Sequence, residues 1–341
     1  MTRRRTGLRI AVSLAVAALL VIVGFAIAHR GQVTAGADAP AASARPSSAS
    51  TPSAAPVEQS LPTGSNAYAM QWDGEQRTYR VFVPTGLTGP SPLVVMLHGG
   101  GGSGQQAETS YGWDRLAQEE HIIVAYPDAL GPVIHAWNVD GVDETGAPCC
   151  GRSGRDGVDD VGFVLAMVEA IEQASPIDRG RVFAAGISNG GILSYTLACE
   201  SDVFAAIAPD SATMLADCRH PNPTSVIHIH GLEDTTIPFD GSPGTGPATI
   251  DGPRIDSVIE AWRTVDGCDA PDVTTAGVVV TSIASCADGR SVELVTVADG
   301  EHGWPGAPLK PGDPEEFRHQ PSQALDATSV IWQFFAAHPK R

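Results

Sequence analysis

The stretch Gly186-Ile187-Ser188-Asn189-Gly190 decides the fold of this chain, because it sets a serine between two glycines where the predicted secondary structure changes. The apolar run before it, residues 181–185, predicts a buried strand, and the run after it, residues 191–198, predicts a helix. So tight a turn leaves no room for a Cβ on either side of the serine, and glycine tolerates the strained backbone. A glycine-rich turn with an incidental serine is the alternative, but the strand and helix favour a Ser188 hydroxyl exposed as a nucleophile at the end of a sheet.

Outward from this turn, predicted strands and helices alternate along the sequence. The continuous apolar runs 93–97 and 122–126 are typical of strands buried on both faces, whereas residues 78–83 alternate like a half-exposed strand. Further elements are expected as strands at 204–208, 226–230 and 292–297, and as helices after Asp159-Asp160 and at 258–265 and 328–337. This alternation predicts an α/β fold with a mostly parallel sheet and helices on both faces. In such sheets reactive groups gather at the carboxyl ends of the strands.

A histidine near a strand end is the expected base for the serine. A serine hydroxyl needs a base within hydrogen-bond reach, and the base needs an orienting acid. In chains with this turn the order is Ser, then Asp or Glu, then His. His302 stands in a glycine-rich loop directly after the last predicted strand, so we expect it to be the base. His228 and His230 share one face of a buried strand and are expected to be core or pocket-lining residues.

Three carboxylates compete for the role of the orienting acid. Asp234 follows the end of the strand that carries His230, and we expect it to be the acid. Its neighbour Glu233 and Asp210, which ends the preceding strand, are its rivals. The acid fixes the imidazole tautomer and stabilises the imidazolium, for which one carboxylate suffices.

A loop rich in glycine supplies candidate donors for the oxyanion of an acyl-transfer reaction. The backbone N–H of Asn189, directly after the nucleophile, is the first expected donor. The second is expected from the loop 97–104, from Gly100 or else Gly101. A phosphate-binding loop is the weaker interpretation, because no G-K-[ST] follows. Three further residues are candidates for lining the substrate pocket: His98, Trp137 and Trp304.

Several blocks of this sequence together resemble a known family. They are residues 97–104, Cys149-Cys150-Gly151, 157–163, 186–191, 228–234 and 302–306. In this order they resemble the secreted polyhydroxybutyrate depolymerases and feruloyl esterases, a group akin to carbohydrate esterase family 1. The resemblance covers about residues 65–340. It implies an α/β-hydrolase fold, a triad of Ser188, Asp234 and His302, and esters of hydroxyacids, hydroxycinnamic acids or acetylated xylan as substrates.

Two other functions stay open beside ester hydrolysis through an acyl-enzyme. One is a secreted acyltransferase that modifies cell-wall sugars, similar to the mycolyltransferases, and the other is a tethered binding domain without catalysis. We expect no cofactor, and no metal because the cysteine spacing matches no zinc pattern. The sequence ends at Arg341, soon after His302, so we expect no C-terminal polymer-binding domain. That expectation favours soluble or oligomeric esters over solid polyester.

The sequence before the predicted globular part divides into two segments. Residues 1–30 combine a basic start with an uncharged apolar run at 10–28, which is long enough to span a bilayer. Residues 26–28 also fit a cleavage site, so the segment is either a signal peptide or a membrane anchor, and both export the chain. Residues 31–64 are rich in Ala, Ser and Pro and predict a disordered linker before a catalytic domain at 65–341.

Charge and cysteine content restrict the partners and the compartment. The formal net charge of −18 repels phosphate backbones, which disfavours nucleic acid as a partner. An even number of cysteines in an exported chain favours disulfides. Short loops favour the pairs Cys199–Cys218 and Cys268–Cys286, which leaves Cys149 and Cys150 as a vicinal bridge.

Overall fold

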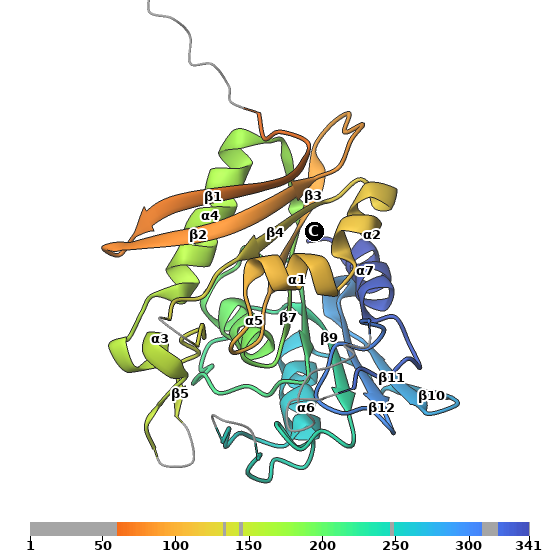
Figure 1. Ribbon diagram of the computed structural model, residues 1–341. Coiled ribbons are helices and arrows are strands. Elements are labelled where there is room, and N and C mark those ends of the chain that lie inside the picture. Colours follow the sequence, from red (N-terminus) through yellow and green to blue (C-terminus); the bar gives the residue numbers. More distant parts are fainter. Residues whose placement is uncertain (1–59, 132–133, 143–145, 246–248, 309–319, 341) are drawn as a thin grey trace, which may run out of the picture. The chain divides into compact units, whose positions relative to one another are not determined.

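A ten-stranded sheet forms the centre of the described part of the chain. The computed structural model describes residues 60–131, 134–142, 146–245, 249–308 and 320–340, all within one unit that spans residues 56–341. The strand order is β1-β2-β4-β3-β7-β8-β9-β12-β11-β10 (Figure 1). The strands are β1 (Gly64–Trp72), β2 (Glu75–Val83), β3 (Ser91–Leu97), β4 (Ile123–Pro127), β7 (Ile177–Ile187), β8 (Ala206–Asp210), β9 (Ser225–Gly231), β10 (Asp272–Ala276), β11 (Val279–Ser285) and β12 (Ser291–Val297).

Neighbouring strands from β4 to β12 run parallel, and antiparallel strands extend the sheet at both edges. The parallel pairs are β4–β3, β3–β7, β7–β8, β8–β9 and β9–β12. At one edge β2 pairs antiparallel with both β4 and β1, and at the other β11 does so with β12 and β10. The predicted α/β fold with a mostly parallel sheet is therefore confirmed.

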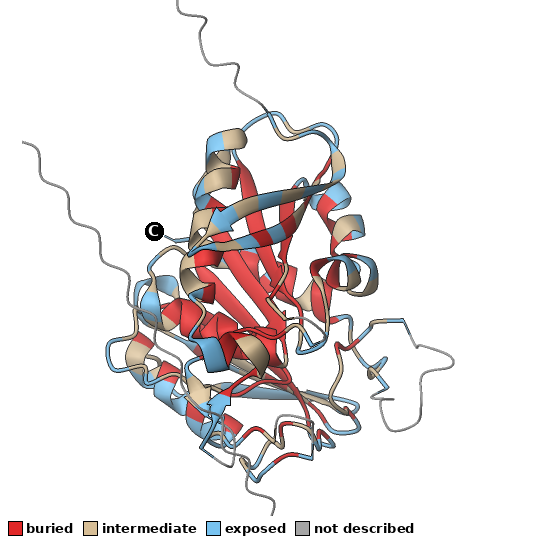
Figure 2. Cartoon of the chain, turned by 60° about the vertical axis from the view of Figure 1, so that its left-hand side comes forward, coloured by how far each residue is buried: buried red, intermediate tan, exposed pale blue. Residues whose placement is uncertain are grey.

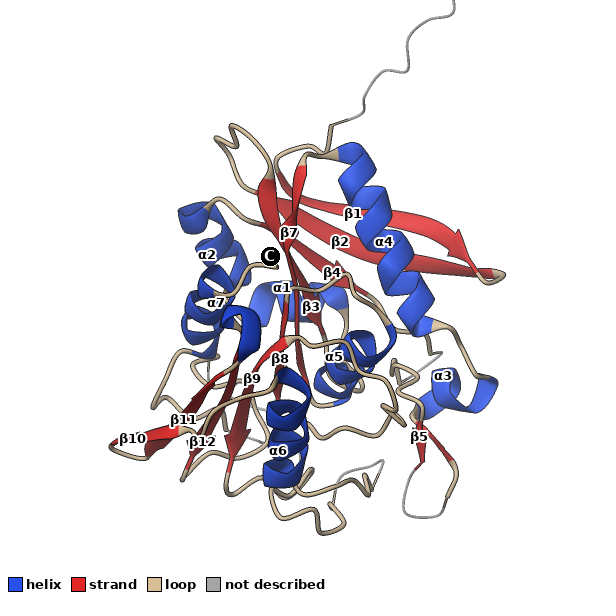
Figure 3. Ribbon diagram, turned by 180° about the vertical axis from the view of Figure 1, so that it is seen from behind, coloured by secondary structure: helices blue, strands red, loops and turns tan. Residues whose placement is uncertain are grey.

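Helices cover both faces of this sheet (Figure 3). One apolar cluster joins the sheet to α4 (Asp160–Ala174), α5 (Asn189–Glu200) and α6 (Ile255–Asp266). The opposite cluster joins it to α1 (Gly104–Ser110), α2 (Trp113–Glu120) and α7 (Ala327–Ala337). In β3, Leu93 and Val95 belong to the first cluster while Val94 and Met96 belong to the second. A strand between two helical layers thus needs apolar residues at every position, and Figure 2 shows the central strands buried throughout.

Smaller elements lie outside this sheet. A short hairpin of β5 (Gly141–Val142) and β6 (Pro148–Cys149) leads into α3 (Gly151–Asp156), and a 3₁₀ turn, η1 (Ala287–Gly289), precedes β12. These elements were not expected from the sequence, nor were β1, α1, α2, β10 and β11. Of these elements, α1 directly follows the glycine-rich loop.

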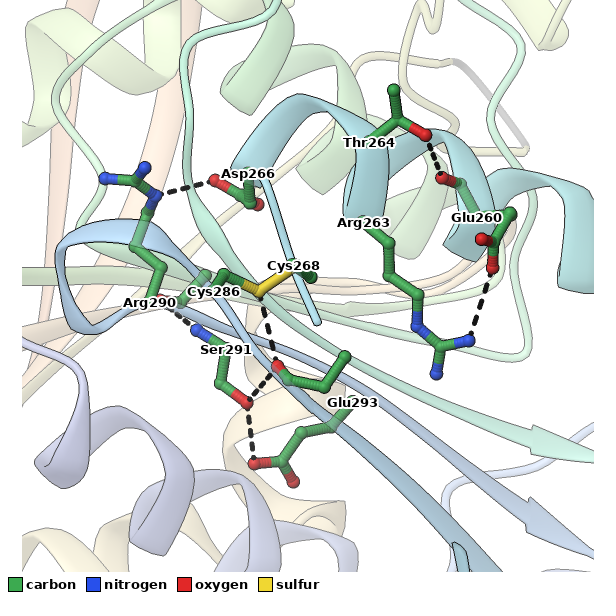
Figure 4. Close-up of a disulfide and its surroundings, with 11 residues drawn as sticks. Glu260, Arg263, Thr264, Asp266, Cys268, Cys286, Arg290, Ser291 and Glu293 are labelled. Atoms are coloured by element: carbon green, nitrogen blue, oxygen red, sulfur yellow. Dashed lines mark hydrogen bonds and ion pairs between the residues drawn. A yellow bond between two sulfur atoms is a disulfide. The ribbon is translucent and has the colours of Figure 1, made fainter. Parts of the chain in front are cut away.

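Three disulfides pair all the cysteines of the chain, as the loop lengths predict. They are Cys149–Cys150, Cys199–Cys218 and Cys268–Cys286. The last one joins the end of α6 to the turn before β12, and Figure 4 shows its surroundings. There Arg290 Nε donates to Asp266 Oδ1 at 2.7 Å, so an ion pair and a disulfide fasten the same helix end.

The predicted export segment is not among the residues that the structure describes. Within the described ranges, no helix has the length and apolar character needed to cross a membrane. Residues 1–30, with the apolar run 10–28, and residues 31–59 of the expected linker lie outside those ranges. The choice between signal peptide and anchor stays a prediction.

Candidate active site

Ser188 occupies a strained turn between β7 and α5. Its φ and ψ of 55° and −125° are unusual for a residue with a Cβ, and its N–H donates to the Asp210 carbonyl at 2.9 Å. A Cβ on Gly186 would lie 2.3 Å from the Gly190 carbonyl oxygen, and a Cβ on Gly190 would lie 2.4 Å from the Leu97 carbonyl oxygen. Both flanking glycines are therefore required by close backbone contacts. The predicted strand and helix on either side are confirmed, and the half-exposed serine stands at the carboxyl end of the strand.

The structure brings His302 and Asp234 into direct contact. His302 Nδ1 lies 2.8 Å from Asp234 Oδ2, and Asp234 Oδ1 accepts hydrogen bonds from the N–H groups of Thr236 at 2.8 Å and Ile237 at 2.9 Å. The Asp234 side chain is completely buried, while 10% of the His302 side chain is exposed. Because the carboxylate accepts the Nδ1 proton, Nε2 is the imidazole nitrogen that can take up another proton.

Two glycines hold the loops of the acid and the base together. A Cβ on Gly231, at the end of β9, would lie 2.2 Å from the Gly300 carbonyl oxygen. A Cβ on Gly300 would lie 2.9 Å from the Gly231 Cα. The same Gly300 carbonyl accepts the Glu233 N–H at 2.8 Å. The loop after β9 and the loop after β12 thus meet backbone to backbone, which places Asp234 beside His302.

The two aspartates at the ends of adjacent strands have pKa values shifted in opposite directions. Burial acts to raise the pKa of Asp234, but the hydrogen bond from His302, the positive charge of His302 when it is protonated, and the Ile237 N–H outweigh burial and lower the pKa. Burial raises the pKa of Asp210 well above its usual range. Neither carboxyl oxygen of Asp210 has a hydrogen-bond partner among the described residues, and the charge of Asp234 raises the pKa of Asp210 further, against the opposing effect of the Ser211 hydroxyl. The surroundings therefore favour the charged form of Asp234 and the neutral form of Asp210.

The remaining rival, Glu233, is exposed to solvent. Of the three carboxylates considered from the sequence, Asp234 alone forms a hydrogen bond with His302 in the described part of the chain. Its contact with His302 thus distinguishes Asp234 from Glu233, its neighbour in the sequence, and from Asp210, at the end of the adjacent strand.

The glycine-rich loop after β3 lies against the serine turn. A Cβ on Gly99 would lie 3.4 Å from Ser188 Cβ, and a Cβ on Gly100 would lie 3.8 Å from Asn189 Cβ. The Gly101 N–H donates to the His135 carbonyl at 2.7 Å. The two predicted donors, Gly100 and Asn189, are thus neighbours, and the N–H of Gly101 is already engaged.

Trp137 and His98 support this loop from within the core. The Trp137 backbone N–H donates to Asn189 Oδ1 at 2.7 Å, Asn189 Nδ2 donates to the Trp137 carbonyl at 3.2 Å, and Trp137 Nε1 donates to the His98 carbonyl at 2.9 Å. Burial lowers the pKa of His98 to about 4, against the opposing effect of the Gly99 carbonyl. The neutral ring donates through Nδ1 to the Gly99 carbonyl at 2.7 Å and accepts the Ala129 N–H at Nε2.

The three predicted pocket residues are all buried. Trp304 is 2% exposed, donates through Nε1 to Thr328 Oγ1 at 3.0 Å and packs on Tyr111 with ring centroids 5.0 Å apart. His98 and Trp137 have no exposed surface. Their contacts brace the site, and contact with substrate stays a prediction. The pairing of Trp137 with the Asn189 side chain was missed from the sequence, since no local pattern joins residues so far apart.

Comparison with known proteins places the chain among esterases. The family model for esterase PHB depolymerase matches residues 77–232, a range that contains Ser188. Probable feruloyl esterase C of Aspergillus niger is 30% identical over 297 residues, which cover 81% of this chain and 88% of that protein. Putative esterase NocK of Nocardia uniformis is 31% identical over 264 residues, covering 70% and 74%. Feruloyl esterase B of Piromyces equi is 30% identical over 243 residues, and this chain spans 43% of its length.

Solved structures share the fold. The acetyl xylan esterase from Aspergillus awamori has a TM-score of 0.54 at 17% identity, covering 80% of this chain and 99% of that one. Native pOPH has a TM-score of 0.52 at 17% identity, covering 84% and 90%. The predicted α/β-hydrolase fold is confirmed. Since two relatives with at least 30% identity are matched over more than two thirds of their own length, this chain belongs to the esterase PHB depolymerase family of carboxylic ester hydrolases.

Proposed function

We propose that this protein is an exported serine ester hydrolase with Ser188 as nucleophile, His302 as base and Asp234 as orienting acid. The hydrogen bond between His302 Nδ1 and Asp234 Oδ2 is the observation that carries this proposal. It supports a fixed tautomer that leaves His302 Nε2 as the proton acceptor. The strained turn at Ser188, at the carboxyl end of the central strand β7, supports the role of that serine.

In this mechanism Ser188 Oγ attacks the ester carbonyl carbon and His302 Nε2 takes its proton. The imidazolium, stabilised by Asp234, then gives that proton to the leaving alcohol, and an acyl-enzyme remains. Water then attacks the acyl carbonyl carbon while His302 Nε2 takes its proton. The imidazolium gives that proton to Ser188 Oγ, which leaves, and the acid is released. The N–H groups of Asn189 and Gly100 stabilise the oxyanion at each tetrahedral intermediate. Because the Gly101 N–H is bound to the His135 carbonyl, Gly100 is the better second donor.

We propose hydroxycinnamoyl and acetyl esters of polysaccharide, and oligomers of hydroxyalkanoates, as the substrate classes. The names of the relatives support this choice, since they include feruloyl esterases and an acetylxylan esterase. The three disulfides support export, because disulfides persist in oxidising compartments. The predicted signal segment at residues 1–30 supports the same location.

A hydrolysis panel with the purified protein tests the proposal. The panel contains p-nitrophenyl acetate, methyl ferulate, acetylated xylan and 3-hydroxybutyrate oligomers, each with a Ser188→Ala control. We expect the control to lose activity by at least about 10⁴-fold. Unchanged hydrolysis by Ser188→Ala overturns the triad. If an added acceptor such as trehalose becomes acylated and less free acid forms, the reaction is acyl transfer rather than hydrolysis, with the same triad.

A further inference from the structure

A second imidazole lies next to the proposed catalytic acid. His230 Nε2 is 3.6 Å from Asp234 Oδ2, the oxygen that also binds His302, and 2.9 Å from the Ile237 carbonyl oxygen. The backbone N–H of Ile237 in turn donates to Asp234 Oδ1. The backbone of Ile237 therefore has two partners: its carbonyl oxygen bonds to His230, and its N–H donates to Asp234. The mechanism proposed above assigns no role to His230.

Hydrogen bonds continue from His230 to the helix that begins after the nucleophile. His230 Nδ1 lies 3.0 Å from His228 Nε2, and His228 Nδ1 lies 2.8 Å from the Tyr195 hydroxyl. Tyr195 belongs to α5, which starts immediately after Ser188. The three side chains have no exposed surface, and the rings of Trp262 and Phe239 pack beside Tyr195 and His230.

The chain of hydrogen bonds admits one set of tautomers. A carbonyl oxygen only accepts, so His230 Nε2 carries the proton and its Nδ1 accepts. His228 Nε2 must then donate to His230, which leaves His228 Nδ1 to accept the Tyr195 hydroxyl proton. A second proton on His230 would set its Nδ1–H against the Nε2–H of His228. Burial lowers the pKa of His230 to about 4 and that of His228 well below its usual value, so both rings are neutral.

We propose that His230 is a positioning residue for Asp234. Its Nε2–H fixes the Ile237 carbonyl, and so fixes the turn that presents the Asp234 carboxylate to His302. His228 and Tyr195 hold the His230 ring in the one tautomer that can donate to this turn. This inference rests on the proposed triad, because His230 acts only through Asp234.

Two isosteric variants separate positioning from plain packing. In His230→Gln the amide nitrogen reaches the position of the imidazole Nε2 and keeps the donor to Ile237. In His230→Asn the shorter amide reaches only the position of Nδ1 and loses that donor. Both variants place one neutral polar amide in the same buried site, so each serves as the control for the stability of the other.

The assay measures kcat and KM on p-nitrophenyl acetate, with active sites counted by titration with a phosphonate ester inhibitor. We expect His230→Asn to lower kcat by about 10- to 100-fold with KM changed less than about threefold, since small displacements of catalytic groups have effects of this size. His230→Gln should retain kcat within about fivefold.

Equal kcat per titrated site in His230→Asn and the unmodified protein overturns the inference, as do equal losses in the Asn and Gln variants. Asp234→Asn, assayed in parallel, separates the two proposals. If Asp234→Asn is inactive while His230→Asn is fully active, the triad stands and the positioning role of His230 falls. If Asp234→Asn keeps full activity, the triad falls and the role of His230 falls with it.

Discussion

Replacement of Asp234 by asparagine should reverse the tautomer of His302, the proposed base. The N–H groups of Thr236 and Ile237 both point at Oδ1, so the new amide must place its oxygen there. Its NH₂ group then faces His302 Nδ1 at the position of Oδ2, 2.8 Å away. Because a donor now faces Nδ1, this nitrogen becomes the acceptor and Nε2 carries the proton. The imidazole can then no longer remove the proton from Ser188.

The expected loss follows from this tautomer. Holding the base in the wrong tautomer lowers kcat by about 10⁴-fold in serine hydrolases, which corresponds to about 5 kcal/mol of transition-state stabilisation. The fold should change little, because both backbone hydrogen bonds to Oδ1 survive the substitution. Loss of one charge-assisted hydrogen bond should lower the free energy of unfolding by about 1.5–3 kcal/mol.

Asp210→Asn is the matched control, since it makes the same chemical change at the end of the adjacent strand. The Asp210 carboxyl is buried and burial raises its pKa well above the usual range, so an amide of equal shape should leave kcat within about threefold of the unmodified value. The assay is p-nitrophenyl acetate hydrolysis at neutral pH, with circular dichroism to confirm that both variants are folded. The assignment of Asp234 is refuted if its variant stays within about tenfold of the unmodified enzyme, or if the Asp210 variant loses more.

Two further substitutions, and the pH dependence of Asp210→Asn, test the contacts that stabilise the fold around the site. Gly190→Ala puts a Cβ 2.4 Å from the Leu97 carbonyl oxygen and should destabilise the fold by about 1–3 kcal/mol, measured by urea unfolding; unchanged stability contradicts the close contact. Loss of the Cys199–Cys218 bridge by double serine substitution should cost about 3 kcal/mol, from its sequence separation of 19, and an unchanged melting temperature argues against that pair. Because the pKa of Asp210 is raised in the folded state, the folded protein binds a proton that the unfolded chain has lost above pH 3.8. The free energy of unfolding therefore falls as the pH rises from 3.8 towards the raised pKa. Asp210→Asn should therefore raise the melting temperature at pH 8 but not at pH 3, and equal changes at both values refute a neutral Asp210.

The sequence predicted those parts of the fold whose signals are local. Strands between two helical layers must be apolar at every position, so β3 and β4 were found within a residue or two of their ends. The turn at Ser188 was found because a Cβ on Gly186 or Gly190 would collide with a carbonyl oxygen, at 2.3 Å and 2.4 Å respectively. Contacts this close demand glycine at both positions, and so leave a fixed spacing in the sequence.

Strands with a weak sequence pattern, and contacts between residues far apart in the sequence, were not predicted. β1 alternates between partly and fully exposed residues and carries Asn, Gln and Gly, which do not favour strands, and its pairing with β2 is what orders it. β10 is exposed along its whole length and likewise depends on its neighbour. The bracing of Asn189 by Trp137 joins two loops that only the folded sheet brings together.

Asp210 and Asp234 show why position at a strand end does not by itself assign a catalytic acid. Both follow adjacent parallel strands and both are buried, so the desolvation of each carboxylate is unfavourable. The difference is the number of donors. Asp234 accepts hydrogen bonds from the N–H groups of Thr236 and Ile237 and pairs with His302. The carboxyl oxygens of Asp210 have no hydrogen-bond partner among the described residues, and burial raises the pKa of that carboxyl well above its usual range. The backbone turn after β9, rather than the carboxylate itself, therefore distinguishes the acid of the proposed triad.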